Sequence, residues 1–299
     1  MIAITAPASP IRDRAKLECG VRYLESLGYR VVIGHSVESY DGYLAGSDQL
    51  RAKELERFFT DPTIGAIFCA RGGYGTTRLL ELLDWEKIRR NPKIIVGFSD
   101  ITALQWALLT RAAMPSLSGL MVGVDFADLD PASESLFWSL LTESELRERH
   151  VWQGTPDDCI IGGYGSGRLL PGTLTLVAAL CGTPFIPPLD SNILVLEDVG
   201  EDSYRIDRML CQLSLAGILR QCSALAFGAF TPDATLQRST PDRPLRTIFA
   251  EYAHKAGDKP SVMNLPYGHI RGKISLPLGL WARLNADRQQ LVLTEALVR

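Results

Sequence analysis

The sequence lacks the signatures of export and of membrane insertion. Its N-terminus, MIAITAPASPIRDR, has no basic start followed by a long apolar stretch, as a secretory signal would have. No uninterrupted apolar run approaches the roughly 18 residues that a membrane-spanning helix needs. We therefore expect a cytoplasmic protein that has no membrane partner.

The sequence also lacks an excess of charge of one sign. It has 31 basic and 34 acidic residues, a net charge of -3, and no dense block of Lys and Arg. A protein that binds nucleic acid by neutralising phosphates normally carries a basic patch or stripe. This balance disfavours a nucleic-acid partner.

Metal-binding motifs are missing as well. No two of the six cysteines form a CxxC pair, and no HExxH occurs, so the common zinc and thioredoxin-type motifs are absent. Most cysteines lie among apolar residues, which is typical of buried thiols in a reducing compartment. We expect neither a metal nor another cofactor.

The composition that remains is that of an ordinary globular protein. The chain has 299 residues, of which 46% are hydrophobic and 22% charged. This length suits two domains of about 150 residues each. In the first half, short apolar runs alternate with helical patterns, which predicts a parallel sheet covered on both faces. The expected strands are 2–5, 30–33, 66–69 and 93–98, and the expected helices are 11–27, 47–59, 76–83 and 101–111.

The second half is less regular and predicts a mixed α/β domain. We expect an N-terminal α/β domain over 1–130, a polar, partly helical linker over 131–158, and a C-terminal domain over 159–299. In the last of these we expect helices at 172–181, 204–219 and 243–256, and strands at 192–197, 223–229 and 291–293.

The sharpest motif is Gly97-Phe98-Ser99-Asp100, between an expected strand and an expected helix. A serine on a tight strand-to-helix turn is exposed at the sheet edge, where it can act as a nucleophile. The simpler interpretation, which is favoured when the turn is considered alone, is that Ser99 or Asp100 caps the helix. The fuller G-x-S-x-G pattern is not met, because position 101 is Ile.

Two further segments follow expected strands. Arg71-Gly72-Gly73-Tyr74-Gly75 could bring backbone N–H groups close to an oxyanion, or could be a plain glycine turn. Glu197, in LEDVGED, ends an apolar strand. Its acidic cluster could bind a metal, orient a histidine or form a solvated loop, and considered alone it favours the loop.

Of the four histidines, His269 is the best candidate for a base. It lies in a glycine-flanked loop, in Tyr267-Gly268-His269, whereas a lone histidine is more often structural. The segment 162–168, GGYGSGR, is similar to a phosphate loop but lacks the Lys-Ser/Thr ending, so we expect no nucleotide site there.

Taken together, these motifs resemble one family, the LD-carboxypeptidases. The resemblance covers nearly the whole chain and rests on ARGGYG, VGFSDITAL, LVLEDVGEDSYRIDRML and LPYGHIRGKISLPLG in that order. A fifth segment, PGTLTLVAALCGTPF, departs from the family at Thr173, where Asn is expected. The fold expected is a parallel-sheet N-terminal domain, flavodoxin-like or amidotransferase-like, followed by a mixed α/β domain.

The resemblance implies a serine peptidase with a triad of Ser99, Glu197 and His269. The backbone N–H groups of Gly73 and Asp100 would form the oxyanion hole. The implied reaction removes the terminal D-alanine from a murein tetrapeptide during peptidoglycan recycling, by a protein that is a homodimer. The alternative within the family is a microcin C-type immunity peptidase, which cleaves peptidyl or aminoacyl nucleotide analogues. Candidate cations for the substrate's carboxylate are Arg71, Arg168 and Arg271, and the sequence does not choose among them.

Overall fold

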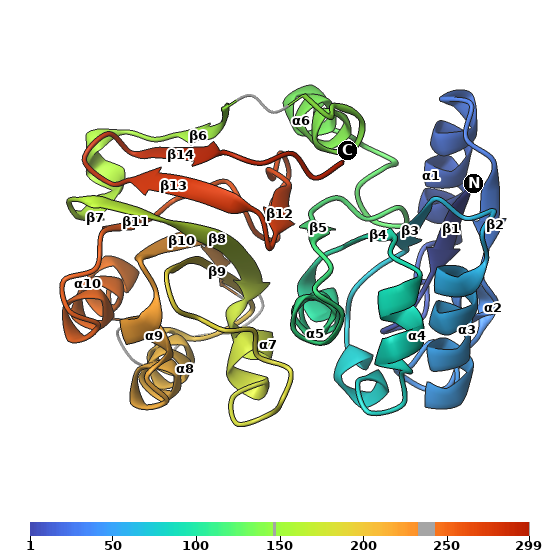
Figure 1. Ribbon diagram of the computed structural model, residues 1–299, viewed down its shortest axis with the longest axis horizontal. Coiled ribbons are helices and arrows are strands. Elements are labelled where there is room, and N and C mark those ends of the chain that lie inside the picture. The colour runs from blue at the N-terminus through green and yellow to red at the C-terminus, as the bar shows by residue number, and fades with distance from the viewer. Residues whose placement is uncertain (146–147, 233–242, 299) are drawn as a thin grey trace. The chain divides into compact units, whose positions relative to one another are not determined.

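The computed structural model describes residues 1–145, 148–232 and 243–298. The chain forms two compact units, Met1–Phe137 and Trp138–Arg299 (Figure 1). The first unit contains five parallel strands and the second contains a mixed sheet, so the predicted α/β fold class is confirmed.

The N-terminal unit contains a sheet of parallel strands. From one side to the other its strands follow the order β2-β1-β3-β4-β5, and every neighbouring pair in this run is parallel. This is the strand order of flavodoxin-like sheets, whose ligands bind beyond the carboxyl ends of the strands. The strands are β1 (Ile2–Thr5), β2 (Val31–Ile33), β3 (Ala66–Cys69), β4 (Ile94–Gly97) and β5 (Ser116–Ser118).

Helices connect these strands and cover the sheet (Figure 1). They are α1 (Arg14–Ser26), α2 (His35–Glu38), α3 (Asp48–Thr60), α4 (Trp85–Arg90) and α5 (Thr102–Ala112). Helix α6 (Pro131–Thr142) follows β5 and extends past Phe137, the last residue of this unit. The helix predicted near 76–83 is a short 3-10 turn, η1 (Thr76–Leu79). A separate helix, α4, then begins at Trp85, and Asp84 caps it by accepting a hydrogen bond from Lys87 N at 2.9 Å.

Apolar residues buried on both faces explain why the first sheet forms. Every residue of β1 is buried, as parallel strands between two layers of helices require. Part of this core is aromatic: Phe68 of β3 meets Phe126 and Phe137 edge to face, with ring centroids 6.3 and 5.9 Å apart. These contacts attach α6, which contains Phe137, to the strand that leads into the glycine-rich loop at 71–75.

The C-terminal unit contains a mixed sheet in the order β6-β14-β13-β8-β9-β10-β11-β7. The central strands from β8 to β11 are parallel, whereas β13, β14, β6 and β7 pair antiparallel. Its strands are β6 (Arg149–Gln153), β7 (Cys159–Ile161), β8 (Tyr164–Thr173), β9 (Asn192–Val199), β10 (Ala224–Thr231), β11 (Ser261–Val262), β13 (Trp281–Asn285) and β14 (Gln290–Leu293). The short strand β12 (Leu276–Leu278) is not part of this sheet. The helices are α7 (Leu174–Ala179), α8 (Ser203–Leu215), α9 (Ile218–Gln221) and α10 (Leu245–Lys255), with a 3-10 turn, η3 (Pro156–Asp158).

Some details of the second half differ from the prediction. Strand β6 lies where only linker and helix were expected, and it pairs with β14 while burying Val151 and Trp152. The glycine-rich segment 162–168 is largely strand rather than loop. A Cβ at Gly167 would lie 1.6 Å from Ser191 O, so only glycine permits this approach of β8 to the residue before β9. Because β8 continues to Thr173, the helix expected at 172–181 is shortened to α7.

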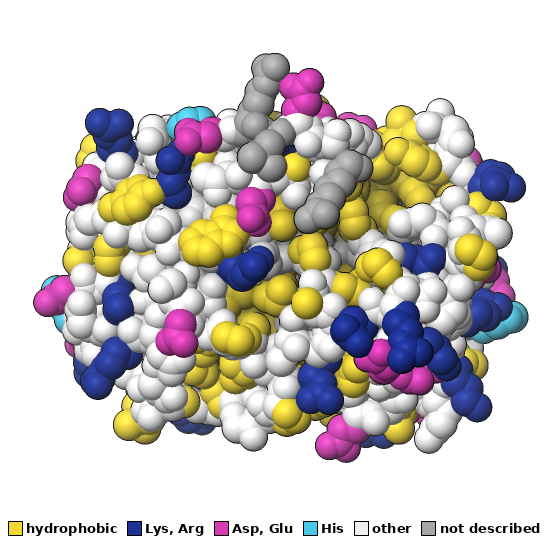
Figure 2. All heavy atoms as spheres, in the orientation of Figure 1, with side chains coloured by type: hydrophobic (Ala, Val, Ile, Leu, Met, Phe, Trp, Pro, Cys, Tyr) yellow, Lys and Arg dark blue, Asp and Glu magenta, His cyan; other side chains and the backbone are white. Residues whose placement is uncertain are grey.

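The surface and the thiols are those of an ordinary globular protein. On the face drawn in Figure 2, basic and acidic side chains occur in mixed groups. Within the described residues, no helix has both the length and the apolar character needed to cross a membrane. All six cysteines are free thiols, but only Cys69 and Cys222 are fully buried, fewer than the sequence led us to expect.

Candidate active site

Ser99 lies on a strained turn directly after β4. The strand ends at Gly97, and Ser99 begins a 3-10 turn, η2 (Ser99–Ile101), that leads into α5. Its φ of 65° is in the left-handed region, which non-glycine residues seldom occupy unless the surroundings impose it. Such strain is expected of a nucleophile presented at a sheet edge.

The glycine-rich loop lies against this turn. A Cβ added at Gly72 would lie only 2.8 Å from Ser99 Cβ and 3.0 Å from Phe98 O. The next residue, Gly73, has a φ of 124°, and its amide N–H makes no hydrogen bond within the described part of the chain. Glycines at these two positions therefore place an available donor beside Ser99, as an oxyanion hole requires.

Asp100 fastens the turn to the loop instead of capping α5. Its Oδ2 accepts hydrogen bonds from Thr76 N at 2.8 Å and Thr76 Oγ1 at 2.7 Å. The carboxyl group is 1% exposed, and burial raises its pKa above the ordinary value. Because the Asp100 side chain bonds to η1, the simple helix-cap interpretation of this aspartate is not supported.

A buried arginine that the sequence did not reveal holds the same loop from the other side. Arg51 is fully buried, and its Nη1 donates to Pro7 O at 2.6 Å and to Gly75 O at 3.1 Å. Its Nη2 pairs with Asp48. One side chain thus links the loop after β1, the loop after β3 and the start of α3.

This packing leads to a prediction for Gly72. In Gly72→Ala, the new methyl group would collide with Ser99, so the turn or the loop must shift. Since a misplacement of about 1 Å can cost about 100-fold in rate, we expect kcat to fall by that factor or more. Gly65→Ala is the control, because a Cβ there meets nothing nearer than Met1 O at 3.8 Å. Equal peptidase rates for the two variants would contradict the role given to Gly72.

In the C-terminal unit, the structure brings Glu197 and His269 together. Glu197, near the end of β9, is completely buried, and its Oε2 lies 2.8 Å from His269 Nδ1. The histidine side chain is 24% exposed. A carboxylate bound to Nδ1 fixes the ring orientation and the tautomer. Of the three possibilities for the acidic cluster, this geometry favours orientation of a histidine.

Thr173, the position that departs from the family, also contacts Glu197. Strands β8 and β9 place the two residues opposite each other, and Thr173 Oγ1 donates to Glu197 Oε1 at 2.5 Å. The threonine hydroxyl therefore satisfies the carboxylate oxygen that His269 does not use. A buried carboxylate needs such partners, because an unpaired one is costly.

The backbone of the loop before His269 is pressed against β10. Ala229 N donates to Tyr267 O at 2.8 Å, and a Cβ at Gly228 would lie 2.2 Å from that same carbonyl oxygen. Gly268 has a φ of 153°, and its own Cβ would lie 2.8 Å from Ala229 Cβ. These close approaches explain the glycine beside the histidine and fix the start of the loop that contains His269.

Next to Glu197, Asp198 is a second buried acid. Thr175 N and Val199 N each donate to it at 2.8 Å. Burial is the main cause that raises its pKa to about 6, and the charge of Glu197 adds to the effect. Its carboxylate holds the first turn of α7 beside the Glu197–His269 pair.

This raised pKa predicts how stability varies with pH. Between the ordinary pKa of 3.8 and the folded-state value of about 6, the folded state binds a proton that the unfolded state does not. The unfolding temperature of the wild type relative to Asp198→Asn should therefore decrease as pH rises from about 4 to about 6, then level off. Scanning calorimetry at several pH values would measure this. A difference that grows with pH would have the wrong sign.

The other acids of the cluster lie apart from this pair. Glu201 and Asp202 are half-buried and lie 3.9 and 4.0 Å from Arg205. Over the ranges 1–145, 148–232 and 243–298, no three His, Cys, Asp or Glu side chains gather in a way that could hold a metal ion.

The predicted site residues thus form two groups. Ser99, Asp100 and Gly73 lie together in the N-terminal unit, and Glu197 and His269 lie together in the C-terminal unit. Sequence reasoning missed Arg51 and Thr76, for which the sequence offers no signal. It also did not use Ser9, whose Oγ accepts a hydrogen bond from Tyr74 N at 3.1 Å.

The sheet orders define a two-unit α/β protein, and comparison with known proteins identifies its family. Residues 2–119 match the LD-carboxypeptidase N-terminal domain and residues 166–284 match the LD-carboxypeptidase C-terminal domain. The chain belongs to the LD-carboxypeptidase family and is a peptidase by that membership.

Individual relatives agree with this family. The murein tetrapeptide carboxypeptidase of Pseudomonas aeruginosa is 35% identical, over 96% of this chain and 94% of that protein. The crystal structure of muramoyltetrapeptide carboxypeptidase from Oxalobacter formigenes is similar with a TM-score of 0.86 and 32% identity, over 98% of this chain and 97% of that one. The microcin C7 self-immunity protein of Escherichia coli is 23% identical, over 97% of this chain and 91% of that protein.

Proposed function

We propose that this protein is a cytoplasmic serine-type LD-carboxypeptidase that releases the terminal D-alanine from murein tetrapeptide in peptidoglycan recycling. The observation that carries the proposal is the left-handed backbone at Ser99, with Gly72 packed against it. A serine that only capped a helix would not need this strain. The similarity to the murein tetrapeptide carboxypeptidase supports the substrate class.

The proposed mechanism starts with Ser99 and His269. Ser99 Oγ attacks the scissile carbonyl carbon, and its proton passes to His269 Nε2. Nε2 is the base because Nδ1 is engaged by Glu197 Oε2. Glu197 holds the imidazole in this tautomer and stabilises the imidazolium that forms, while Thr173 holds Glu197 in place.

The remaining steps follow acyl-transfer chemistry. The N–H groups of Gly73 and Asp100 donate to the oxyanion of the tetrahedral intermediate. The C–N bond then breaks, and the D-alanine amine leaves with the proton that the histidine had taken. A water molecule, deprotonated by the same imidazole, hydrolyses the acyl-enzyme and regenerates Ser99.

This mechanism assigns a part to each proposed domain. The N-terminal domain, 1–130, supplies the nucleophile and the oxyanion donors, and the C-terminal domain, 159–299, supplies the acid and the base. We further propose, from the family resemblance, that the protein is a homodimer. Light scattering would measure its mass in solution, and a mass of 32.9 kDa, that of one chain, would contradict the dimer.

The experiment that tests the proposed function is a release assay. The purified protein is incubated with murein tetrapeptide, and free D-alanine and the tripeptide product are followed by mass spectrometry. We expect both products, and none from a matched tetrapeptide that ends in L-alanine. If the tetrapeptide stays intact while a peptidyl-nucleotide analogue is cleaved, the microcin C-type alternative replaces this proposal.

A further inference from the structure

A carboxypeptidase must recognise the free carboxylate at the end of its substrate. That carboxylate carbon is three covalent bonds, or about 4 Å, from the scissile carbonyl carbon. Its binding partner must therefore lie close to the nucleophile. We propose that Arg71, assisted by Ser9, binds the terminal carboxylate of the substrate; this inference rests on the proposed function.

Arg71 lies next to Ser99 through its own loop. It directly precedes Gly72, the residue packed on Ser99 Cβ. The Arg71 side chain is half-buried and fixed by two backbone carbonyls, with Nε donating to Gly72 O at 3.0 Å and Nη1 to Pro10 O at 3.1 Å. The remaining nitrogen, Nη2, lies 3.6 Å from where a Cβ of Gly73 would be. The guanidinium is therefore held beside the expected oxyanion donor.

The charge of Arg71 is not neutralised by the residues around it. Both of its hydrogen-bond partners are neutral carbonyls, and no carboxylate among the described residues pairs with it. Burial, and then the neighbouring charge of Arg12, lower the pKa of the Arg71 guanidinium. A half-buried cation beside a second cation is stabilised when an anion binds, and a guanidinium suits a carboxylate particularly well.

Ser9 adds a second donor at the same place. Its Oγ already accepts a hydrogen bond from Tyr74 N, which leaves the hydroxyl hydrogen to donate. The side chain is 8% exposed, and its hydroxyl has no acceptor among the described residues. A Cβ at Gly73 would lie 2.3 Å from Ser9 Oγ, so the hydroxyl and the guanidinium flank the same glycine.

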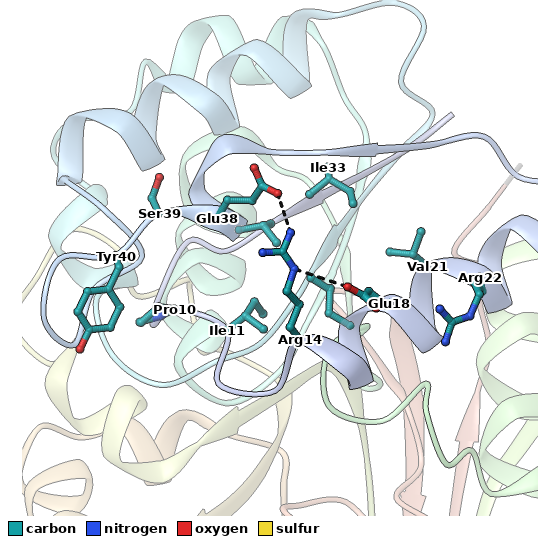
Figure 3. A pocket seen from close by; sticks show the side chains of 12 residues that line it. Pro10, Ile11, Arg14, Glu18, Val21, Arg22, Ile33, Glu38, Ser39 and Tyr40 are labelled. Carbon is teal, nitrogen blue, oxygen red and sulfur yellow. Dashed lines mark hydrogen bonds and ion pairs between the residues drawn. The ribbon is translucent and has the colours of Figure 1, made fainter.

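Two other arginines of this unit, Arg14 and Arg78, already have acidic partners. Figure 3 shows Arg14 in an apolar groove, a cavity of about 410 Å³, with ion pairs to Glu38 at 3.2 Å and Glu18 at 3.6 Å. Arg78 is likewise paired, with Asp48 at 2.7 Å. Of the three cations that the sequence offered, Arg71 is the one whose loop contacts Ser99 within a single compact unit.

The test compares two substrates that differ only at the carboxylate. One is a murein tetrapeptide that ends in D-alanine, and the other ends in D-alanine amide. The wild type should prefer the acid by about 100-fold in kcat/KM, the size expected when one partner of a buried charge pair is removed. In Arg71→Met, kcat/KM for the acid should fall by about that factor, whereas the value for the amide should stay within about threefold. Arg71→Lys should recover part of the preference for the acid, because lysine restores the positive charge but cannot make the two parallel hydrogen bonds that a guanidinium makes with a carboxylate.

Arg14→Met is the matched control, because it removes a nearby arginine that already has acidic partners. It should keep the full preference for the acid. If Arg71→Met loses activity on the acid and on the amide equally, the residue merely shapes the loop and the proposal is overturned. Unchanged preference in Arg71→Met would overturn it as well.

A binding measurement separates this proposal from the proposed function. Calorimetric titration of the Ser99→Ala protein with the acid and the amide gives their affinity ratio without turnover. If the wild type cleaves neither peptide, the proposed function fails, but the ratio still tests Arg71. If the Ser99→Ala protein binds the acid more tightly than the amide and the Ser99→Ala/Arg71→Met protein does not, the result supports the anion site. If the affinity ratio is the same in the two proteins, the result refutes it.

Discussion

Replacement of Ser99 by alanine should remove peptidase activity while the fold stays intact. Both residues have a Cβ, so the left-handed backbone at position 99 is no more strained in the variant. What the variant lacks is Oγ, the oxygen that attacks the substrate. Removing the nucleophile of a serine peptidase costs about 10⁶-fold in kcat, so we expect a residual rate below about 10⁻⁴ of the wild type.

Release of D-alanine from murein tetrapeptide measures this effect, and circular dichroism and thermal melting confirm the fold. Ser39→Ala is a suitable control, since Ser39 is the residue after α2 and its Oγ only donates to His35 O at 2.7 Å. Substantial release by Ser99→Ala would show that the reaction has another centre, and the mechanism proposed above would then be wrong.

Replacement of His269 by alanine should be about as damaging. Without the imidazole, Ser99 keeps its proton, and the buried Glu197 carboxylate loses the partner at its Oε2. Members of a catalytic triad act as a unit, so the loss should again approach about 10⁶-fold. For the same reason, the double variant Ser99→Ala/His269→Ala should be no slower than either single one.

The chain offers a closely matched control for this experiment. His254, on α10, also pairs through Nδ1 with a carboxylate, that of Asp258 at 2.6 Å, but the pair is largely exposed. His254→Ala should therefore keep wild-type turnover. If the two histidine variants lose activity to the same extent, the effect comes from general destabilisation and His269 has no special role.

The fold could be predicted where burial is complete on both faces of a strand. The run Ile2-Ala3-Ile4-Thr5 is apolar because helices cover both sides of β1, and such runs are conspicuous in a sequence. Strand β6 could not be predicted in this way, because only two of its five residues are buried. Strand β8 could not be predicted either, because its glycine-rich start is typical of a loop. In the structure these glycines permit close contact with the segment before β9.

The site was predictable only in part, for a similar reason. Ser99 and Gly73 stand out because a sharp turn requires particular residues within a few positions. The partners Glu197 and His269 are 72 positions apart, so no local pattern joins them, and their pairing came from the family resemblance. Thr173 differs from the residue expected in the family, and this difference is visible in the sequence. Its hydrogen bond to Glu197 is not, because that bond depends on the register of β8 and β9, which no local sequence pattern encodes.

Arg51 has a consequence for the thermodynamics of substrate binding. Together with Asp100 it fixes the loop that follows β3, so the segment with Arg71 and Gly73 is ordered before any substrate arrives. A mobile loop of this kind would lose about 1–2 kcal/mol of conformational entropy per residue on closing over a ligand. In this protein the loop after β3 has already lost that conformational entropy on folding. The substrate should therefore bind without reordering this loop, and its affinity should reflect mainly the groups that it contacts.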